Sequence, residues 1–238
     1  MADNLFYCPD IRQNPILPEQ ESQHCARVLR MHEGDLLTIT DGEGYFYDCK
    51  LLLSHPKKSM VTVLRQWEEP RKREFMLHIA FSPTKQMERN EWFVEKATEI
   101  GVDRFTPILG NFSERKEIKR ERLTRIAISA MKQSQQSRLP LIDEMRSFSE
   151  FVAQPFNGRK FIAHCYDLPK TALSQSYRKG EDVLILIGPE GDFSEQEVAE
   201  AINNGFEPIS LGETRLRTET ASLVALHTIH LVNAITSK

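Results

Sequence analysis

Two short segments in the C-terminal third of the chain combine glycines with charged side chains. The first is Ile187-Gly188-Pro189-Glu190-Gly191-Asp192-Phe193-Ser194, and the second is Leu211-Gly212-Glu213-Thr214-Arg215-Leu216-Arg217-Thr218-Glu219-Thr220-Ala221. Each follows an aliphatic run and precedes a helical pattern, so each is predicted to be a strand-to-helix turn, with glycines that permit close backbone approach or a positive φ. Because such turns lie at the carboxyl ends of strands, where open α/β sheets bind ligands, the two segments predict a binding site.

The residues around these segments predict the elements that hold them. Ser194 and Glu197 fit the capping box that begins a helix, and Gly205 is expected to end that helix. Strands then alternate with helices over residues 74–238, which predicts a largely parallel sheet covered on both faces. The expected strands are Met76–Phe81, Arg104–Ile108, Phe161–His164, Val183–Ile187 and Pro208–Leu211, and the expected helices include Glu91–Ile100 and an apolar C-terminal helix.

The N-terminal part of the chain shows a different pattern. Short strands separated by turns are predicted at Leu36–Thr40, Phe46–Leu53 and Met60–Leu64, and Asp41–Gly44 is a tight hairpin connection. These strands favour a small barrel, and the charged segment Glu68–Arg73 is the expected linker to the α/β part.

The two glycine segments together resemble the cofactor loops of the SPOUT methyltransferases, and most closely those that methylate N3 of a uridine in small-subunit ribosomal RNA. The family pattern is roughly Ile-Gly-Pro-Glu-Gly-Gly-Phe-Ser, followed by Leu-Gly-x-x-Ile-Leu-Arg-Thr-Glu-Thr-Ala. This chain differs at Asp192, where the family usually has glycine, and at Arg215, where an aliphatic residue is common. The Asp192 carboxylate either assists a cationic cofactor or caps the next helix. Further matches lie at His24–Arg30, Lys96–Val102 and Gln133-Ser134, although Gln136 replaces a usual arginine.

The resemblance implies a fold and a set of partners. Residues 1–70 are expected to form a PUA-like β-barrel that binds RNA, and residues 74–238 a SPOUT methyltransferase domain whose mostly parallel sheet contains a trefoil knot. The implied cofactor is S-adenosylmethionine. The implied partners are small-subunit ribosomal RNA, within an assembled subunit, and a second copy of the chain in a homodimer with active sites at the interface.

The resemblance also assigns roles to residues of the two segments. The cofactor-binding residues are expected to be Ile187, Gly188, Pro189, Glu190, Gly191, Leu211, Gly212 and Leu216. Arg217 and Glu219 are the expected catalytic residues, since a guanidinium can stabilise an anionic uracil oxygen or hold a phosphate. Glu219 either accepts the proton or only complements the helix dipole. Glu190 is either a ligand of the cofactor or a capping partner.

The RNA-binding candidates are His24, Arg27, Arg30, Arg115, Lys116 and Arg138. His24 is either an RNA contact or a hydrogen-bonded structural residue. The net charge is −3, but residues 71–146 carry +5 and each flank carries −4. A basic run, from Arg115 to Arg125, could neutralise several phosphates, or it could be the solvated face of an amphipathic helix whose buried stripe includes Leu123 and Met131.

Composition excludes several other classes of protein. No apolar run approaches the roughly 20 residues of a membrane helix, and the chain begins with no signal-peptide pattern, so a cytoplasmic protein with no membrane partner is expected. The four cysteines lack Cys-x-x-Cys spacing and are expected to be buried free thiols, and no metal site is predicted. Two other functions remain open, a SPOUT ribose 2′-O-methyltransferase and a non-catalytic RNA-binding protein of ribosome assembly.

Overall fold

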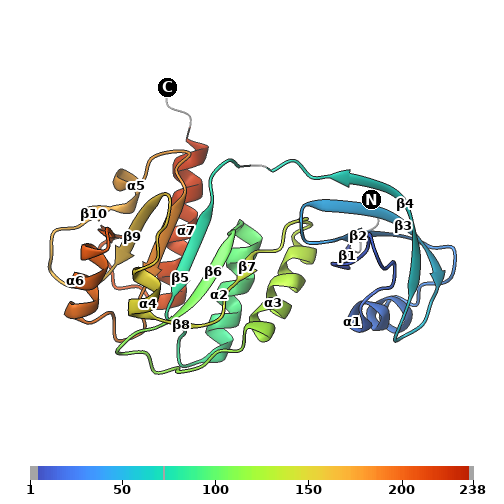
Figure 1. Ribbon diagram of the computed structural model, residues 1–238, viewed down its shortest axis with the longest axis horizontal. Coiled ribbons are helices and arrows are strands. Elements are labelled where there is room, and N and C mark those ends of the chain that lie inside the picture. The colour runs from blue at the N-terminus through green and yellow to red at the C-terminus, as the bar shows by residue number, and fades with distance from the viewer. Residues whose placement is uncertain (1–4, 72, 236–238) are drawn as a thin grey trace. The chain divides into compact units, whose positions relative to one another are not determined.

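The computed structural model describes residues 5–71 and 73–235 and divides into two compact units (Figure 1). Unit 1 comprises the described part of residues 1–73 together with residues 128–139. Unit 2 comprises residues 74–127 and the described part of 140–238. Lys72 of the expected linker lies outside the described residues.

Unit 1 contains a four-stranded sheet in the order β1-β2-β3-β4. The strands are β1 (Leu5–Tyr7), β2 (Leu36–Thr40), β3 (Tyr45–Leu53) and β4 (Met60–Glu68). The β1–β2 pair is parallel, and the other two pairs are antiparallel. A short helix, α1 (Glu19–Gln23), continues into a π-helical turn, η1 (His24–Val28), which the sequence patterns do not predict. The three strands predicted by sequence are confirmed.

A buried carboxylate holds the predicted hairpin between β2 and β3. Asp41 Oδ1 accepts hydrogen bonds from the backbone N–H groups of Glu43 (2.8 Å) and Tyr45 (3.2 Å). Its Oδ2 accepts from the Tyr47 hydroxyl at 2.8 Å and from the Arg12 guanidinium at 3.2 Å. Because Asp41 is only 3% exposed, these four donors satisfy a charge that would otherwise be costly to bury.

Residues 128–139 belong to unit 1 although they follow much of unit 2 in sequence. They include the end of α3 (Arg120–Gln133), where Lys132 Nζ lies 2.6 Å from Oε1 of the buried Glu21. The Thr40 hydroxyl donates to the Ser137 carbonyl at 3.1 Å. These contacts join segments about 100 residues apart in the chain, and no local sequence pattern predicts them.

Unit 2 is built on an eight-stranded sheet in which every described pairing is parallel, as predicted. The order is β10-β12-β9-β11-β5-β6-β7, and β8 also pairs with β6. The strands are β5 (Leu77–Phe81), β6 (Arg104–Leu109), β7 (Leu141–Ile142), β8 (Arg146–Ser147), β9 (Arg159–Ala163), β10 (Thr171–Ala172), β11 (Val183–Ile187) and β12 (Glu207–Ser210).

Helices cover both faces of this sheet. They are α2 (Met87–Ile100), α4 (Phe148–Val152), α5 (Leu173–Ser176), α6 (Glu195–Asn203) and α7 (Thr218–Ala234); residues 120–127 of α3 also belong to unit 2. Alternate side chains of β11 point to opposite faces of the sheet. Leu184 and Leu186 pack against α4 and α6 on one face, and Ile185, which points to the other face, is also buried. On the α2 side, the Phe93 ring packs edge-on against Phe81 and Phe105. The central strands are therefore apolar throughout, as expected of a parallel sheet.

Candidate active site

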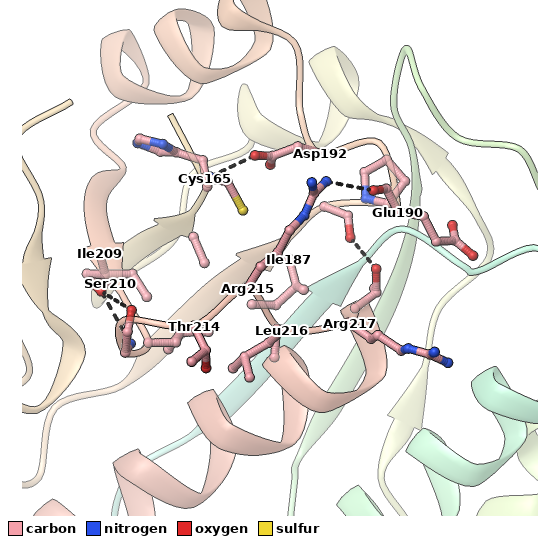
Figure 2. Close-up of a pocket in the computed structure, with 18 residues that line it drawn as sticks. Cys165, Ile187, Glu190, Asp192, Ile209, Ser210, Thr214, Arg215, Leu216 and Arg217 are labelled. Carbon is pink, nitrogen blue, oxygen red and sulfur yellow. Dashed lines mark hydrogen bonds between the residues drawn. The ribbon is translucent and has the colours of Figure 1, made fainter. Parts of the chain in front are cut away.

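The carboxyl ends of β9, β11 and β12 border one pocket of about 300 Å³ in unit 2 (Figure 2). Both glycine segments contribute to it, so the structure brings together seven of the eight predicted cofactor-binding residues and Arg217. The lining residues are Ala163, His164, Cys165, Ile187, Gly188, Pro189, Glu190, Asp192, Ile209, Ser210, Leu211, Gly212, Thr214, Arg215, Leu216, Arg217, Thr218 and Ala221. Gly191 does not line the pocket.

The first loop, residues 188–193 between β11 and α6, is packed tightly. A Cβ on Gly188 would lie 3.2 Å from the backbone N of Phe193, and a Cβ on Gly191 would lie 3.0 Å from Cβ of Phe112. These glycines therefore serve close packing, since neither has a positive φ. The predicted capping box is confirmed, because the Ser194 hydroxyl accepts from the Glu197 N–H and the Glu197 carboxylate accepts from the Ser194 N–H.

Asp192 ties this loop to a third segment. It has a φ of 70°, a conformation that favours glycine, and its side chain makes two backbone contacts. Oδ1 accepts from the Phe193 N–H at 2.8 Å, and Oδ2 accepts from the Cys165 N–H at 2.7 Å. Because Ser194 is the N-cap of α6, Asp192 does not cap that helix.

The third segment, residues 163–165, follows β9 and was missed as part of the site. Its signal was present, since the predicted strand 161–164 should end at the same edge of the sheet as β11 and β12. Cys165 is exposed, so the expectation that all cysteines are buried is wrong for this residue. Desolvation and the neighbouring Asp192 carboxylate raise the Cys165 pKa, while Arg215 and Lys170 oppose that shift.

The second loop, residues 211–217 between β12 and α7, is more open. Gly212 has a φ of 134°, and a Cβ on it would meet nothing within 4 Å. The Thr218 hydroxyl at the start of α7 donates to the Gly188 carbonyl at 2.9 Å and so links the two loops. Arg215 and Arg217 are exposed, and their side chains point in different directions, Arg215 across the pocket and Arg217 away from it (Figure 2).

Glu219 lies outside the pocket lining, in the first turn of α7. It is only 8% exposed, and its Oε1 lies 3.8 Å from Nε of Arg89 on α2. Its Oε2 is buried with no hydrogen-bond partner among the described residues. A buried carboxylate oxygen without a donor is costly, so this atom needs a hydrogen-bond donor that the described residues do not supply.

Glu190 has a structural contact. Its Oε1 accepts from the Lys85 N–H at 3.0 Å, just before α2 begins. The side chain therefore holds the first loop against the β5–α2 connection, while the residue also lines the pocket.

The RNA-binding candidates are distributed over both units. In unit 1, His24 and Arg27 lie on the π-helical turn, and Arg27 and Arg30 are exposed. Arg138 is largely committed within that unit, since it donates to the Glu43 carbonyl at 2.9 Å and its guanidinium fills the space beside Gly44. In unit 2 the Arg115 guanidinium donates to the carbonyls of Thr84 and Lys85, and Lys116 is exposed.

The basic run begins before α3 and continues along its first half. Arg120 pairs with Glu144 at 3.1 Å, and Arg122 pairs with Glu91. Leu123 and Met131 are fully buried, so the amphipathic stripe is confirmed. The exposed face still carries Lys119 and Arg125, so the buried stripe does not exclude RNA contact.

No group of three or more metal-ligating side chains gathers within residues 5–71 and 73–235. His230 instead contacts the Gly101 carbonyl through Nε2 at 2.8 Å. In the part of the chain that the structure describes, every helix is too short or too polar to cross a membrane.

Comparison with known proteins agrees with this architecture. Residues 71–230 match the model of an RNA methyltransferase domain, and residues 17–65 match that of an RNA methyltransferase PUA domain. The ribosomal RNA small subunit methyltransferase E of Bacillus subtilis is 30% identical, with 88% of this chain and 87% of that protein aligned.

Two solved structures share the fold over nearly the whole chain. A probable rRNA-methyltransferase from Porphyromonas gingivalis superimposes with a TM-score of 0.91 at 47% identity, covering 97% of this chain and 98% of that one. A ribosomal RNA small subunit methyltransferase E from Neisseria gonorrhoeae, bound to S-adenosyl methionine, gives 0.85 at 25% identity and covers 96% and 97%. The chain therefore belongs to the ribosomal RNA small subunit methyltransferase E family of RNA methyltransferases.

Proposed function

We propose that this protein transfers a methyl group from S-adenosylmethionine to N3 of a uridine in small-subunit ribosomal RNA. The observation that carries the proposal is the pocket at the carboxyl ends of β9, β11 and β12, which both glycine loops border. Its volume of about 300 Å³ is at the lower end for small-molecule sites, and the main chain beside Gly212 is open. The relative from Neisseria gonorrhoeae, solved with this cofactor bound, supports the choice of ligand.

The chain's residues would divide the work of the reaction. When bound, the cofactor supplies an electrophilic methyl group. The main chain of the two loops positions it, including the groups of Ile187, Gly188, Leu211, Gly212 and Leu216, and Pro189 restricts the first loop. The uracil N3 loses its proton as the N–CH₃ bond forms, so the protein must accept that proton and stabilise the anion.

Glu219 and Arg217 are the proposed catalytic residues. The Glu219 carboxylate has one buried oxygen without a donor, and the Arg89 guanidinium nearby compensates its charge. It is suited to accept the N3 proton. Arg217, exposed at the start of α7, has a delocalised cation that can hold a phosphate or an anionic uracil oxygen.

Single-turnover methylation rates across pH would test these roles. Glu219→Gln should lose about 10² to 10⁴-fold, with partial recovery at high pH where the imide ionises unaided. Arg217→Ala should lose about 10² to 10³-fold while cofactor binding stays near normal. Glu213→Gln changes an exposed carboxylate of the second loop that lies outside the pocket lining, so it is the matched control and should keep full rate. A Glu219→Gln enzyme at full rate would leave Glu219 as a helix-start residue only.

Nucleoside mass spectrometry of ribosomal RNA from cells lacking the gene would identify the product. Loss of N3-methyluridine from small-subunit RNA supports the proposal. Loss of a 2′-O-methyl nucleoside would instead identify a ribose methyltransferase, and an unchanged profile would favour a non-catalytic role in assembly. Comparing naked RNA with assembled subunits as substrates would test whether the subunit is required. We also propose a cytoplasmic location, because the proposed substrate is ribosomal RNA.

We propose that RNA binds to His24, Arg27 and Arg30 of the PUA domain and to the basic run of unit 2. Arg138 stays a candidate, although its guanidinium already donates to the Glu43 carbonyl. If the run meets phosphates, changing Lys119 and Arg125 to Gln should flatten the log–log salt dependence of RNA affinity by roughly 1 to 2. Cofactor affinity should not change. An unchanged slope would mean that the basic run is only the solvated face of an amphipathic helix.

We also propose a homodimer. The adjacent helices α2 and α7 expose apolar side chains, since Trp92 is 45% and Leu231 50% exposed. Sedimentation should report a dimer, and a Trp92→Glu, Leu231→Glu double variant should shift it toward monomer. A monomeric wild-type protein at micromolar concentration would contradict this part of the proposal. The trefoil knot of the SPOUT fold stays a prediction.

A further inference from the structure

The charged side chains that line the pocket differ in how fully their hydrogen bonds are used. Both carboxylate oxygens of Asp192 accept backbone N–H groups, and Glu190 Oε1 accepts the Lys85 N–H. The Arg215 guanidinium, in contrast, makes one contact among the described residues, a 3.3 Å hydrogen bond from Nη2 to the Glu190 carbonyl. A guanidinium has five N–H donors, so Arg215 retains most of its capacity.

Arg215 also lies where a ligand in the pocket would meet it. Its side chain starts on the second loop and runs across the pocket toward Glu190 and Asp192 of the first loop (Figure 2). It is close enough to Cys165, on the third segment, to lower that thiol's pKa against the raising effects of desolvation and Asp192. Arg215 therefore spans the pocket between all three bordering segments, whereas Arg217 points away from it.

We propose that Arg215 binds the carboxylate of the methionine moiety of S-adenosylmethionine. This inference rests on the cofactor site proposed above. The amino-acid end carries the cofactor's only anion, and the planar fork of an arginine matches a carboxylate in two parallel hydrogen bonds. An RNA phosphate is the other anion in the reaction, but the outward-pointing Arg217 is better placed for it. Arg215 is thus a cofactor-binding residue at a position where the family commonly has an aliphatic side chain.

Calorimetric titration without RNA would test the assignment with three ligands. S-adenosylmethionine and S-adenosylhomocysteine carry the carboxylate, and 5′-methylthioadenosine lacks the whole amino-acid end. Arg215→Ala should weaken the first two by about 10 to 100-fold, because a charged hydrogen-bonded contact is lost, and leave methylthioadenosine within about 2-fold. Arg215→Lys should fall between, since it keeps the charge and loses the fork. Arg178→Ala, an exposed arginine outside the pocket, is the control and should bind all three normally.

Two results would overturn the assignment. Equal weakening of all three ligands would mean that Arg215 only shapes the pocket. Unchanged affinities for all three would mean that Arg215 does not bind the carboxylate, and a loss of RNA affinity in the same variant would assign it to an RNA phosphate instead. Failure of the cofactor site itself gives a separate signal. Wild-type affinity for S-adenosylmethionine in a folded Gly212→Val protein would show that the cofactor does not bind at this pocket. The assignment of Arg215 would then fail as well.

Discussion

The two loops that border the pocket use glycine for different purposes. In the first loop, a Cβ on Gly188 would press on Phe193, whose side chain is completely buried. In the second loop, Gly212 has a positive φ and open space around it. The first loop is therefore fixed by its own packing, and the second is held open. A rigid wall facing an open one lets a ligand enter without reorganising the buried side, which favours preorganised binding.

The largest effect expected from this difference is on ligand affinity. Gly212→Val would place a branched side chain in the open space, and we expect S-adenosylmethionine to bind about 100-fold more weakly or worse, as overpacking a fitted site costs up to about 3 kcal/mol. The strained φ should cost about 1 to 3 kcal/mol of stability and leave the protein folded. Calorimetry and thermal unfolding would measure the two effects separately.

Gly180→Val is a matched control for that experiment. Gly180 also has a positive φ, 85°, and a Cβ on it would meet nothing within 4 Å, but it lies outside the pocket lining. It should show the strain in its unfolding curve and bind the cofactor normally. Equal loss of affinity in both variants would mean that backbone strain, and not the space beside Gly212, controls binding.

A second prediction concerns stability in the first loop. Gly188→Ala should lower the free energy of unfolding by about 1 to 3 kcal/mol, because the buried Phe193 cannot move away from the added methyl. Gly191→Ala should cost less, although its contact with Phe112 Cβ is shorter, because residues 111–112 form an exposed turn whose backbone can move more easily than the buried Phe193. Chemical denaturation of the two variants would give the order. A larger loss at Gly191 would contradict the account of a wall fixed by Phe193.

Sequence predicted the parts of the site that depend on local pattern. The strand ends, the capping box at Ser194 and both glycine segments follow from composition and spacing over a few residues, and the structure confirms them. The purpose of each glycine could not be predicted, because it depends on neighbours such as Phe112 that are distant in the chain.

What sequence missed arises from contacts between distant segments. Residues 163–165 enter the site because β9 lies beside both β11 and β12. The sequence predicts that this strand ends at the same edge of the sheet, but not which strands are its neighbours. The return of residues 128–139 to unit 1 depends on Lys132 and Ser137 meeting partners near the N-terminus. Arg138 was predicted as an RNA contact, and its guanidinium donates to the hairpin carbonyl of Glu43, a partner about 95 residues away in the chain.

A smaller quantity, about 1 kcal/mol, is expected as the difference in stability between two variants of Asp192, the residue that joins the first loop to the third segment. Asp192→Ala removes both amide contacts and keeps the positive φ, so it should destabilise the protein by about 1 to 3 kcal/mol. Asp192→Gly removes the same contacts but relieves the left-handed conformation, which should recover about 1 kcal/mol. The difference between the two unfolding free energies isolates the backbone term. Equal values would show that the backbone at this position is not strained.

The smallest expected effect is on the Cys165 thiol, where the two loops act in opposite directions. Desolvation and Asp192 of the first loop raise the Cys165 pKa, and Arg215 of the second loop lowers it. Asp192→Asn should therefore shift the pH midpoint of Cys165 alkylation downward, and Arg215→Ala should shift it upward.

Iodoacetamide labelling across pH would measure these midpoints. The other thiols interfere little, because Cys8, Cys25 and Cys49 are buried and burial raises the pKa of Cys8 to about 11 and of Cys49 to about 12. Cys165→Ser should abolish the early labelling and confirm its source. Shifts of the same sign in both variants would mean that Arg215 does not lower the Cys165 pKa in solution. The contrast between a closed loop and an open one would then hold for the glycines alone.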